Sequence, residues 1–451
     1  MFGHVPFKFT PTGAGKTLTF WIPLLFNGNG ISIIITALNG LGDQNIAELQ
    51  RLAIPAVNVT GQNATDKLFK EIEERQYRVV IISPELITQD RRVKTILWQS
   101  KKFVSHIFNI TIDEGHCVSE WGKEFRPEYS QLGRLRWILP PQIPFHIVSA
   151  TMPSRILKDV ISTLNMRREN ISKVRLSNDC PNIHLVVVEL LHSAKSMYDI
   201  NRVLRIHPSP LQAGSGLQHV KFMIFCNSCR DTQRMALFLR EQLPPHLRDK
   251  IIWFHSGMTQ EFRSEMIEKL RKGEIWGICC TDAAGMGLDI QDVEVIIQWG
   301  YVKSLCTLMQ RLGRGARSPN LEATGIYFVD KNYNKKRGKG GMKPGSKRKS
   351  ATQGGASKKA RSSGAASGEV RGPVGRQEEA DESESSESGS EEEETEENVE
   401  GASSSVEEEY ETAVMDVFIN AHKHSVCRRR VANEYFGNSS TCMLLLPDWI
   451  L

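Results

Sequence analysis

The sequence has no long uninterrupted apolar run, although 40% of its 451 residues are hydrophobic. A helix that crosses a bilayer needs about 20 such residues, so no membrane contact is expected. The N-terminus also lacks the continuous apolar stretch of a secretory signal peptide. The nine cysteines are scattered, without the regular spacing of a disulfide framework, and this favours a reducing compartment. Cys226 and Cys229 form an isolated CxxC, which we interpret as a strand-to-helix turn.

Two stretches lack charge of one sign. Residues 331–376 are rich in Lys, Arg, Gly and Ser with almost no acidic residue, whereas residues 377–411 carry Ser/Glu repeats and no basic residue. Neither buries enough apolar surface to offset its ordering entropy, so both are expected to be disordered. The basic stretch has three open interpretations: a split nuclear-import signal, a nonspecific DNA tether or a solvated linker. The acidic stretch is expected to contact the basic one, chromatin or basic proteins, or only to solubilise the chain.

Up to about residue 330, apolar strands alternate with helical patterns, which is typical of parallel α/β layers. The strands fall into two sets separated around residues 170–200, which predicts two tandem domains, 1–170 and 171–330. The predicted strands are Ser32–Ile35, Val79–Ser83, Phe108–Ile112, His146–Ser149, Lys221–Cys226, Ile251–Phe254, Trp276–Cys280, Val293–Gln298 and Gly325–Val329.

A candidate phosphate-binding loop lies near the N-terminus and consists of Thr12, Gly13, Ala14, Gly15, Lys16 and Thr17. Glycines let backbone amides turn toward phosphate oxygens, and the helix that follows points its positive end at the same anion. Lys16 is expected to reach the β/γ-phosphates of ATP, and the Thr17 hydroxyl is expected to bind Mg²⁺. Thr10 stands where the strict pattern has glycine.

The candidate catalytic carboxylates are Asp113 and Glu114, at the end of the apolar run Phe108–Ile112. This position puts them at the carboxyl edge of a parallel sheet, where α/β folds bind ligands. Asp113 is expected to hold Mg²⁺, and Glu114 to orient or deprotonate the attacking water. His116 has two open interpretations: it couples the nucleotide site to the second domain, or it is an ordinary buried histidine with its hydrogen bonds satisfied.

The second domain contains an arginine motif, Gln-x-x-Gly-Arg-x-x-Arg, which includes Gln310, Arg314 and Arg317. At this spacing the two arginines are expected about one helical turn apart on the same side of a helix. An arginine that enters a nucleotide site from a second domain stabilises charge on the transferred phosphoryl group. With the phosphate loop and the carboxylates, the motif points to an ATP-driven motor on nucleic acid.

The string Cys117–Tyr129, directly after the carboxylates, resembles the RecQ family of DNA helicases. In that family this aromatic-rich loop links single-strand binding to ATP hydrolysis. Trp121 and Phe125 offer faces on which unpaired bases can stack, and Arg126 can pair with phosphate or stack. The alternative for the aromatic residues is a buried cluster.

Other segments are similar to the family in the same order: Thr36 through Gln44, Ile82–Glu85, Ser149–Thr151, Phe254–Gly257 and Thr281–Asp289. The resemblance implies two RecA-like motor domains, DNA contacts at Ser83 and Thr281, and a contact of Asp289 with the nucleotide ribose. Gly115 replaces the alanine that is usual in the family, a change expected to be minor.

The C-terminal residues 412–451 resemble a remnant of the zinc-binding subdomain that follows RecQ motors, and Val414–Ala421 has an amphipathic pattern. Cys427 through Arg430 and Tyr435 through Gly437 are similar to its start. A structural zinc site needs four ligands, and only Cys442 follows among the cysteines. An intact zinc site is therefore not expected.

The resemblance implies an ATP-dependent DNA helicase that moves 3′→5′ with ATP and Mg²⁺, acting on single-stranded, branched or duplex DNA during recombination and repair in the nucleus. Two alternatives stay open: a DNA-stimulated ATPase or translocase without unwinding, and a catalytically inactive DNA or chromatin scaffold. The family places adenine-recognising residues before the phosphate loop, and the nine residues before Thr10 do not supply them. We therefore expect an N-terminally truncated motor with weakened ATP affinity.

Overall fold

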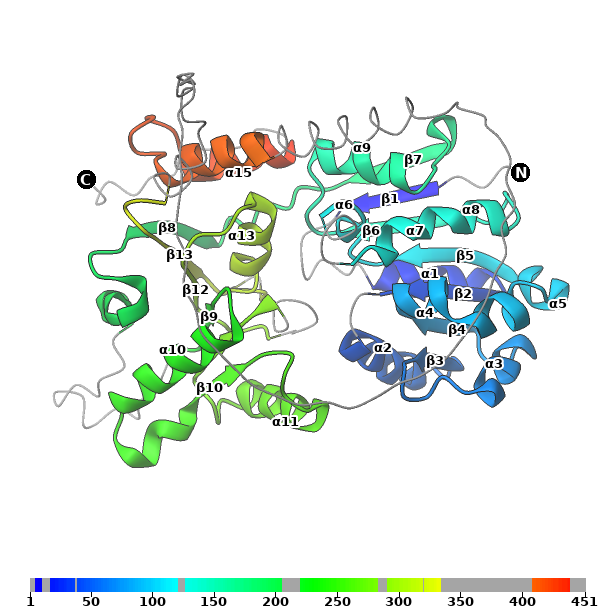
Figure 1. Cartoon of the computed structure of the whole chain (residues 1–451), viewed down its shortest axis with the longest axis horizontal. Helices are drawn as coiled ribbons and strands as arrows, with labels where there is room; N and C mark the ends of the chain where they lie inside the picture. The colour runs from blue at the N-terminus through cyan, green and yellow to red at the C-terminus, as the bar shows by residue number, and fades with distance from the viewer. Residues whose placement is uncertain are drawn as a thin grey trace, which may run out of the picture. The chain divides into compact units, whose positions relative to one another are not determined.

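The computed structural model of the chain describes residues 5–9, 17–36, 39–120, 126–204, 220–282, 290–318, 320–333 and 408–438. Two parallel sheets, each with helices on both faces, contain most of these residues (Figure 1). The sequence-based prediction of two tandem RecA-like α/β domains is confirmed, and each of the nine predicted strands is present. We call the first sheet and its helices the first lobe, and the second sheet and its helices the second lobe.

The first lobe contains a seven-stranded sheet in the order β3-β4-β2-β5-β6-β1-β7. Its neighbouring strands are all parallel. The strands are β1 (Val5–Phe9), β2 (Ile31–Ile35), β3 (Ala56–Val59), β4 (Val79–Ile82), β5 (Ile107–Ile112), β6 (Phe145–Ser149) and β7 (Ile171–Arg175). The helices are α1 (Leu18–Phe26), α2 (Asn39–Arg51), α3 (Asp66–Glu73), α4 (Pro84–Gln89), α5 (Lys101–Val104), α6 (Cys117–Glu120), α7 (Glu128–Gln131), α8 (Leu135–Ile138) and α9 (Ser154–Thr163).

Both faces of the central strands of the first sheet are buried. Successive side chains of a strand point to opposite faces, and in β2 Ile33 and Ile35 belong to one apolar cluster while Ile34 belongs to another. The first cluster includes Phe69 of α3, and the second includes Phe20 of α1. Burial on both faces explains why these strands are continuous apolar runs instead of alternating patterns.

The second lobe contains a six-stranded parallel sheet in the order β10-β11-β9-β12-β13-β8. The strands are β8 (Ile183–Glu189), β9 (Phe222–Phe225), β10 (Ile251–Phe254), β11 (Gly277–Cys280), β12 (Val295–Trp299) and β13 (Ala323–Val329). The helices are α10 (Cys229–Glu241), α11 (Gln260–Arg271) and α13 (Leu305–Leu312). Shorter π- or 3₁₀-helical segments in the two lobes are η1 (Val93–Leu97), η2 (Leu132–Arg134), η3 (Arg168–Asn170), η4 (Ala194–Ser196), η5 (Tyr198–Arg202) and η7 (Pro245–Lys250).

Four strands were not among the predicted ones, and one of them moves a domain boundary. These strands are β1, β3, β7 and β8. Because β7 pairs with β1 from Ile171 to Arg175, the first sheet ends at Arg175 and not at residue 170. The segment that connects the two sheets is therefore residues 176–182, between β7 and β8; we call it the linker.

The described C-terminal residues form two helices, one at residues 408–419 and α15 at Arg428–Phe436. Met415 and Phe418 are buried, which confirms the predicted amphipathic helix. It begins at residue 408, so the expectation of disorder up to residue 411 is wrong at its end. Tyr333 Oη donates to Asp416 Oδ1 at 2.8 Å, which ties this helix to the end of the second lobe.

Candidate active site

The candidate carboxylates lie in a tight turn at the end of β5. The Asp113 amide donates to the Ile35 carbonyl oxygen of β2 at 2.9 Å, and the Gly115 amide donates to the Val148 carbonyl oxygen of β6 at 2.8 Å. Glu114 has a φ of 48°, a left-handed conformation that is uncommon for a residue with a side chain. Its amide donates to Asp113 Oδ1 at 3.0 Å, so the aspartate stabilises the turn. The turn is thus held between two neighbouring strands.

A buried chain of polar groups leads from this turn to the end of β6. His116 Nδ1 lies 2.8 Å from Ser149 Oγ and 3.4 Å from Glu114 Oε2. The Ser149 hydroxyl donates to the Thr151 carbonyl oxygen at 3.0 Å. That hydroxyl proton is therefore used, so we assign the His116 Nδ1 proton to the bond with Ser149. His116 is 1% exposed, so its orientation is set by these contacts and not by water.

Gly115 packs closely against β6. A Cβ atom added there would lie 2.3 Å from Ile147 Cγ2, well inside van der Waals contact. The expectation that this glycine is a minor departure stays a prediction, since alanine at this position requires the isoleucine to move. Gly115 therefore allows the carboxylate turn to approach its neighbouring strand.

The phosphate loop itself, Thr12 through Lys16, lies outside the described residues. Its flanks are described: β1 lies between β6 and β7, with Phe9 in register with Ser149. Thr17 is the N-cap of α1, and its side chain makes no capping hydrogen bond. The carboxyl end of β1 therefore lies at the same edge of the sheet as the carboxylate turn, where parallel sheets bind ligands.

The residues available for Mg²⁺ suit that ion. Thr17 offers a hydroxyl oxygen that the helix cap does not use, and Asp113 offers a carboxylate at the end of β5. Mg²⁺ prefers hard oxygen ligands and commonly takes only one or two from the protein. Among the described residues, no group of three or more His, Cys, Asp or Glu side chains is arranged to hold a metal.

The predicted DNA-contact residues are only partly described, since Trp121 and Phe125 lie outside the described residues. Arg126 Nε lies 3.4 Å from Glu85 Oε1. Ser83 is the N-cap of α4, and its Oγ accepts from the Leu86 amide at 3.3 Å. The structure thus brings Arg126 next to the Ile82–Glu85 segment and gives Ser83 a structural role in capping α4.

In the second lobe the helical interpretation of the arginine motif is wrong. Helix α13 ends at Leu312 with Gly313 as its C-cap, so Arg314 and Arg317 follow the helix. Ala316 has a φ of 43°, which no helix contains, and its amide donates to the Val293 carbonyl oxygen at 2.9 Å. The one-turn spacing argument fails because the chain leaves the helix before either arginine. Arg314 is nevertheless 5% exposed, so this turn is well packed.

Arg311 is a buried arginine that the motif analysis missed. Its Nε and Nη2 donate to the two carboxylate oxygens of Asp282 at 2.7 and 2.6 Å. Its Nη1 donates to Gln298 Oε1 at 2.7 Å and to Asn227 Oδ1 at 2.9 Å. Arg311 follows Gln310, the first residue of the arginine motif. This network therefore fixes the C-terminal end of α13, after which Arg314 and Arg317 follow. An arginine within an apolar helix, Leu305–Leu312, was the available signal.

The remaining predicted positions are placed as follows. Thr281 follows β11, and its amide donates to the Phe254 carbonyl oxygen at 3.3 Å. Asp289 and Cys442 lie outside the described residues. The CxxC is confirmed as a strand-to-helix turn: β9 ends at Phe225, and Ser228 caps α10, which begins at Cys229. No helix in the described ranges is both long and apolar enough to cross a membrane.

Comparison with known proteins agrees with this geometry. The chain matches the DEAD/DEAH box helicase family over residues 8–160 and the helicase conserved C-terminal domain over residues 211–319. The structure is similar to that of Mss116p bound to ssRNA and AMP-PNP, with a TM-score of 0.58 and 21% identity, over 73% of this chain and 67% of that one. Two parallel-sheet lobes, together with these two helicase family matches, define the class: the chain is a superfamily-2 helicase.

Its curated relatives narrow the class. The chain is 30% identical to the ATP-dependent DNA helicase hus2/rqh1 of Schizosaccharomyces pombe, over 70% of this chain and 23% of that protein. It is 28% identical to the ATP-dependent DNA helicase RecQ of Synechocystis, over 68% of this chain and 61% of that protein. The chain is similar to these ATP-dependent DNA helicases, and it spans less than two thirds of the length of either relative.

Proposed function

We propose that this chain is an ATP-dependent DNA helicase of the RecQ type, which couples ATP hydrolysis to 3′→5′ movement on DNA and to unwinding. The observation that carries the proposal is the buried cluster of Glu114, His116 and Ser149, in which His116 Nδ1 lies 3.4 Å from Glu114 Oε2 and 2.8 Å from Ser149 Oγ. It connects the group suited to activating water with the segment Ser149–Thr151 on the neighbouring strand. A hydrolase needs a group such as Glu114 to activate water. A motor also needs a contact of this kind, through which a change at the nucleotide site is transmitted to the rest of the protein.

In this proposal each group has a defined task. Lys16 and the loop amides bind the ATP phosphates, and Thr17 with Asp113 would hold Mg²⁺, which neutralises phosphate charge. Glu114 orients the attacking water and accepts its proton. Arg314 and Arg317 of the second lobe stabilise charge on the transferred phosphoryl group, an effect worth roughly 10³–10⁵ in rate for such arginines. Asp289 contacts the ribose.

The proposed DNA contacts follow the family pattern. Trp121 and Phe125 stack on unpaired bases while Arg126 contacts phosphate. Ser83 and Thr281 contact the DNA backbone, one from each lobe. DNA is the substrate named for the curated relatives, hus2/rqh1 and RecQ, and this supports DNA over RNA for the present chain.

The charged segment and the cellular role are also proposals. Residues 331–376 would be a basic segment that tethers DNA. Residues 377–407 would be an acidic segment that contacts chromatin or basic proteins. The C-terminal residues from 408 onward would correspond to the beginning of the family's zinc-binding subdomain. In this account the protein acts on single-stranded and branched DNA during recombination and repair in the nucleus.

The test is strand displacement on duplexes that carry a single-stranded tail at either the 3′ or the 5′ end. The proposal predicts unwinding of the 3′-tailed duplex with ATP, little unwinding of the 5′-tailed one, and none with a nonhydrolysable ATP analogue. Equal unwinding of both tails would contradict the polarity. ATP turnover that DNA stimulates, but with no displaced strand, would instead support a translocase that does not unwind.

A binding scaffold is the second candidate, favoured by the opposed charge of residues 331–376 and 377–411. Binding through a basic segment weakens steeply with salt because counterions are released. The scaffold predicts salt-sensitive DNA binding that is unchanged by Lys16→Ala and lost when residues 331–376 are deleted. The helicase predicts binding that ATP modulates and that survives this deletion in part.

A further inference from the structure

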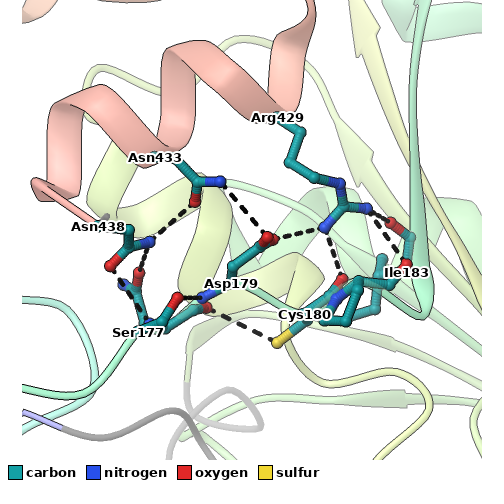
Figure 2. A network of polar contacts seen from close by, with 9 residues as sticks. Ser177, Asp179, Cys180, Ile183, Arg429, Asn433 and Asn438 are labelled. Atoms are coloured by element: carbon teal, nitrogen blue, oxygen red, sulfur yellow. Dashed lines mark hydrogen bonds and ion pairs between the residues drawn. The ribbon is translucent and has the colours of Figure 1, made fainter. Parts of the chain in front are cut away.

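Helix α15 holds the linker between the two lobes through one arginine. Arg429 Nη1 donates to Asp179 Oδ1 at 2.5 Å and to the Cys180 carbonyl oxygen at 2.8 Å. Its Nη2 donates to the Ile183 carbonyl oxygen at 2.6 Å. Figure 2 shows the guanidinium group lying against the linker, with the carboxylate on one side and the carbonyl groups on the other. The rigid fork of an arginine suits several acceptors held in one plane.

Two asparagines of the C-terminal end extend the same contact. Asn433 Nδ2 lies 3.4 Å from Asp179 Oδ2. Asn438 Nδ2 donates to Asn178 Oδ1 at 2.8 Å, and the Asn178 amide lies 3.4 Å from Asn438 Oδ1. The side chains of Asn433 and Asn438 lie next to one another in Figure 2. Linker residues 178–180 are thus held along one side by α15 and the residue after its C-cap.

The linker is also bound to both candidate catalytic segments. Asn178 Nδ2 donates to the Ala150 carbonyl oxygen at 3.1 Å, within Ser149–Thr151. Asn182 Nδ2 donates to the Ala316 carbonyl oxygen at 2.8 Å, between Arg314 and Arg317. One short linker therefore carries a hydrogen bond to the segment beside the carboxylates and another to the arginine turn.

A small cavity lies at the same junction. It has a volume of about 30 Å³ and is lined by residues that include Thr151, Asn178, Gln310 and Arg429. Thr151 Oγ1 and Gln310 Nε2 are buried and form no hydrogen bond with any described residue. Two polar groups that can each form a further hydrogen bond border this cavity. The junction therefore has room for a second arrangement of hydrogen bonds.

We propose that Arg429 and Asp179 are positioning residues, which hold the linker so that movement at Ser149–Thr151 is transmitted to the turn of Arg314 and Arg317. The proposal rests on the proposed motor function. Arg429 touches no reacting group; it acts through Asn178 and Asn182, whose carbonyl partners belong to the two segments. The C-terminal pair of helices is then a part of the motor and not only an appendage of the second lobe.

The test compares Arg429→Ala with Arg430→Ala in the full chain. Arg430 is the matched control, since it lies on the same helix, its side chain is 66% exposed, and its ion pair with Glu434 stays within α15. ATP turnover without DNA should stay within about twofold of wild type in both variants. DNA stimulation should fall on the order of tenfold in Arg429→Ala, within the 5- to 150-fold range of coupling between sites, and should be unchanged in Arg430→Ala.

Asp179 provides a double-mutant cycle. If the two residues act as one unit, Asp179→Ala and the double variant should lose about as much DNA stimulation as Arg429→Ala alone. Arg429→Lys, which keeps the charge but not the fork, should retain an intermediate value. Additive losses in the double variant, or equal stimulation in Arg429→Ala and Arg430→Ala, would overturn the proposal.

Hydrogen exchange supplies a readout that does not require activity. Arg429→Ala should accelerate amide exchange in residues 176–180 and, with them, at Thr151 and Arg317, because local opening follows the lost contacts. Arg430→Ala should not. Faster exchange confined to α15 would overturn the proposal even if the wild-type protein had no ATP turnover. If the wild-type protein has no ATP turnover but the variants show the expected exchange pattern, the result contradicts the proposed motor function and not the positioning role of Arg429. An Arg429→Ala variant that fails to fold leaves Arg429→Lys and Asp179→Ala for the same two measurements.

Discussion

His116 and Ser149 are joined by a buried hydrogen bond, with 2.8 Å between Nδ1 and Oγ. The bond crosses from the turn after β5 to the last residue of β6, so it connects the candidate water-activating group to the Ser149–Thr151 segment. The sequence left two interpretations open for His116: coupling of the nucleotide site to the second domain, or an ordinary buried histidine. The geometry has features of both. The histidine is buried and hydrogen-bonded, and its partner is a residue of a motor segment.

Ser149→Ala should therefore reduce strand displacement per ATP more than it reduces ATP hydrolysis itself. The variant leaves His116 Nδ1 without this acceptor in a buried site, which costs about 1–3 kcal/mol. The measurement is the ratio of base pairs unwound to ATP consumed, beside wild type. An equal loss in both rates would show that Ser149 supports only the chemical step.

Gly115→Ala should destabilise the first lobe by about 1–3 kcal/mol, the usual effect of an added methyl in a packed core. The new Cβ would lie 2.3 Å from Ile147 Cγ2. Gly61→Ala is the control, since no atom lies within 4 Å of a Cβ added there. Denaturant unfolding monitored by circular dichroism checks both. Equal stability of the two variants would mean that Ile147 moves without cost.

Arg311→Lys should lower stability and slow ATP turnover, although it keeps the charge. A lysine cannot reproduce the paired bonds to Asp282 together with those to Gln298 and Asn227. The buried acceptor Gln298 Oε1, left without this donor, costs about 1–3 kcal/mol. Thermal unfolding and steady-state turnover are the measurements. Asp282→Asn should have a smaller effect on stability, since that side chain is 48% exposed.

The lowered pKa of Asp90 predicts that the free energy of unfolding depends on pH. The hydrogen bond from the Arg92 side chain lowers the pKa of Asp90, and Arg92 Nη2 lies 2.6 Å from Asp90 Oδ2. A carboxyl whose pKa is lowered by folding contributes stability above its unfolded pKa of about 3.9 and loses it as pH falls through the folded value. Asp90→Asn should thus be less stable than wild type at pH 7, and the difference should shrink below about pH 4. A difference in unfolding free energy that stays constant from pH 7 to pH 3 would contradict this assignment.

The fold was predictable from the sequence because most strands are apolar runs buried on both faces. The strands that were missed lack that signal. In β7, Ser172 to Arg175 are exposed, and the pattern ISKVR does not stand out. In β1, the pattern VPFKF contains a proline and a lysine. The sheet position of these strands depends on pairing with distant residues, as when Phe9 lies in register with Ser149.

The site was predictable as a set of motifs but not in its geometry. Spacing alone placed Arg314 and Arg317 on a helix, whereas Gly313 ends the helix and Ala316 takes a left-handed conformation. The bond of Arg429 to Asp179 joins residues 250 positions apart, and no local pattern announces such a contact. Arg311 was hidden for the same reason, since its partners come from three other segments.

The most direct test of the motor is ATP hydrolysis by the purified chain with and without single-stranded DNA, beside Lys16→Ala and Glu114→Gln. The account predicts turnover that DNA stimulates and that both variants lose, by about 10²–10⁴-fold for Glu114→Gln if it acts as the general base. Turnover by folded wild-type protein no greater than that of the two variants would contradict it.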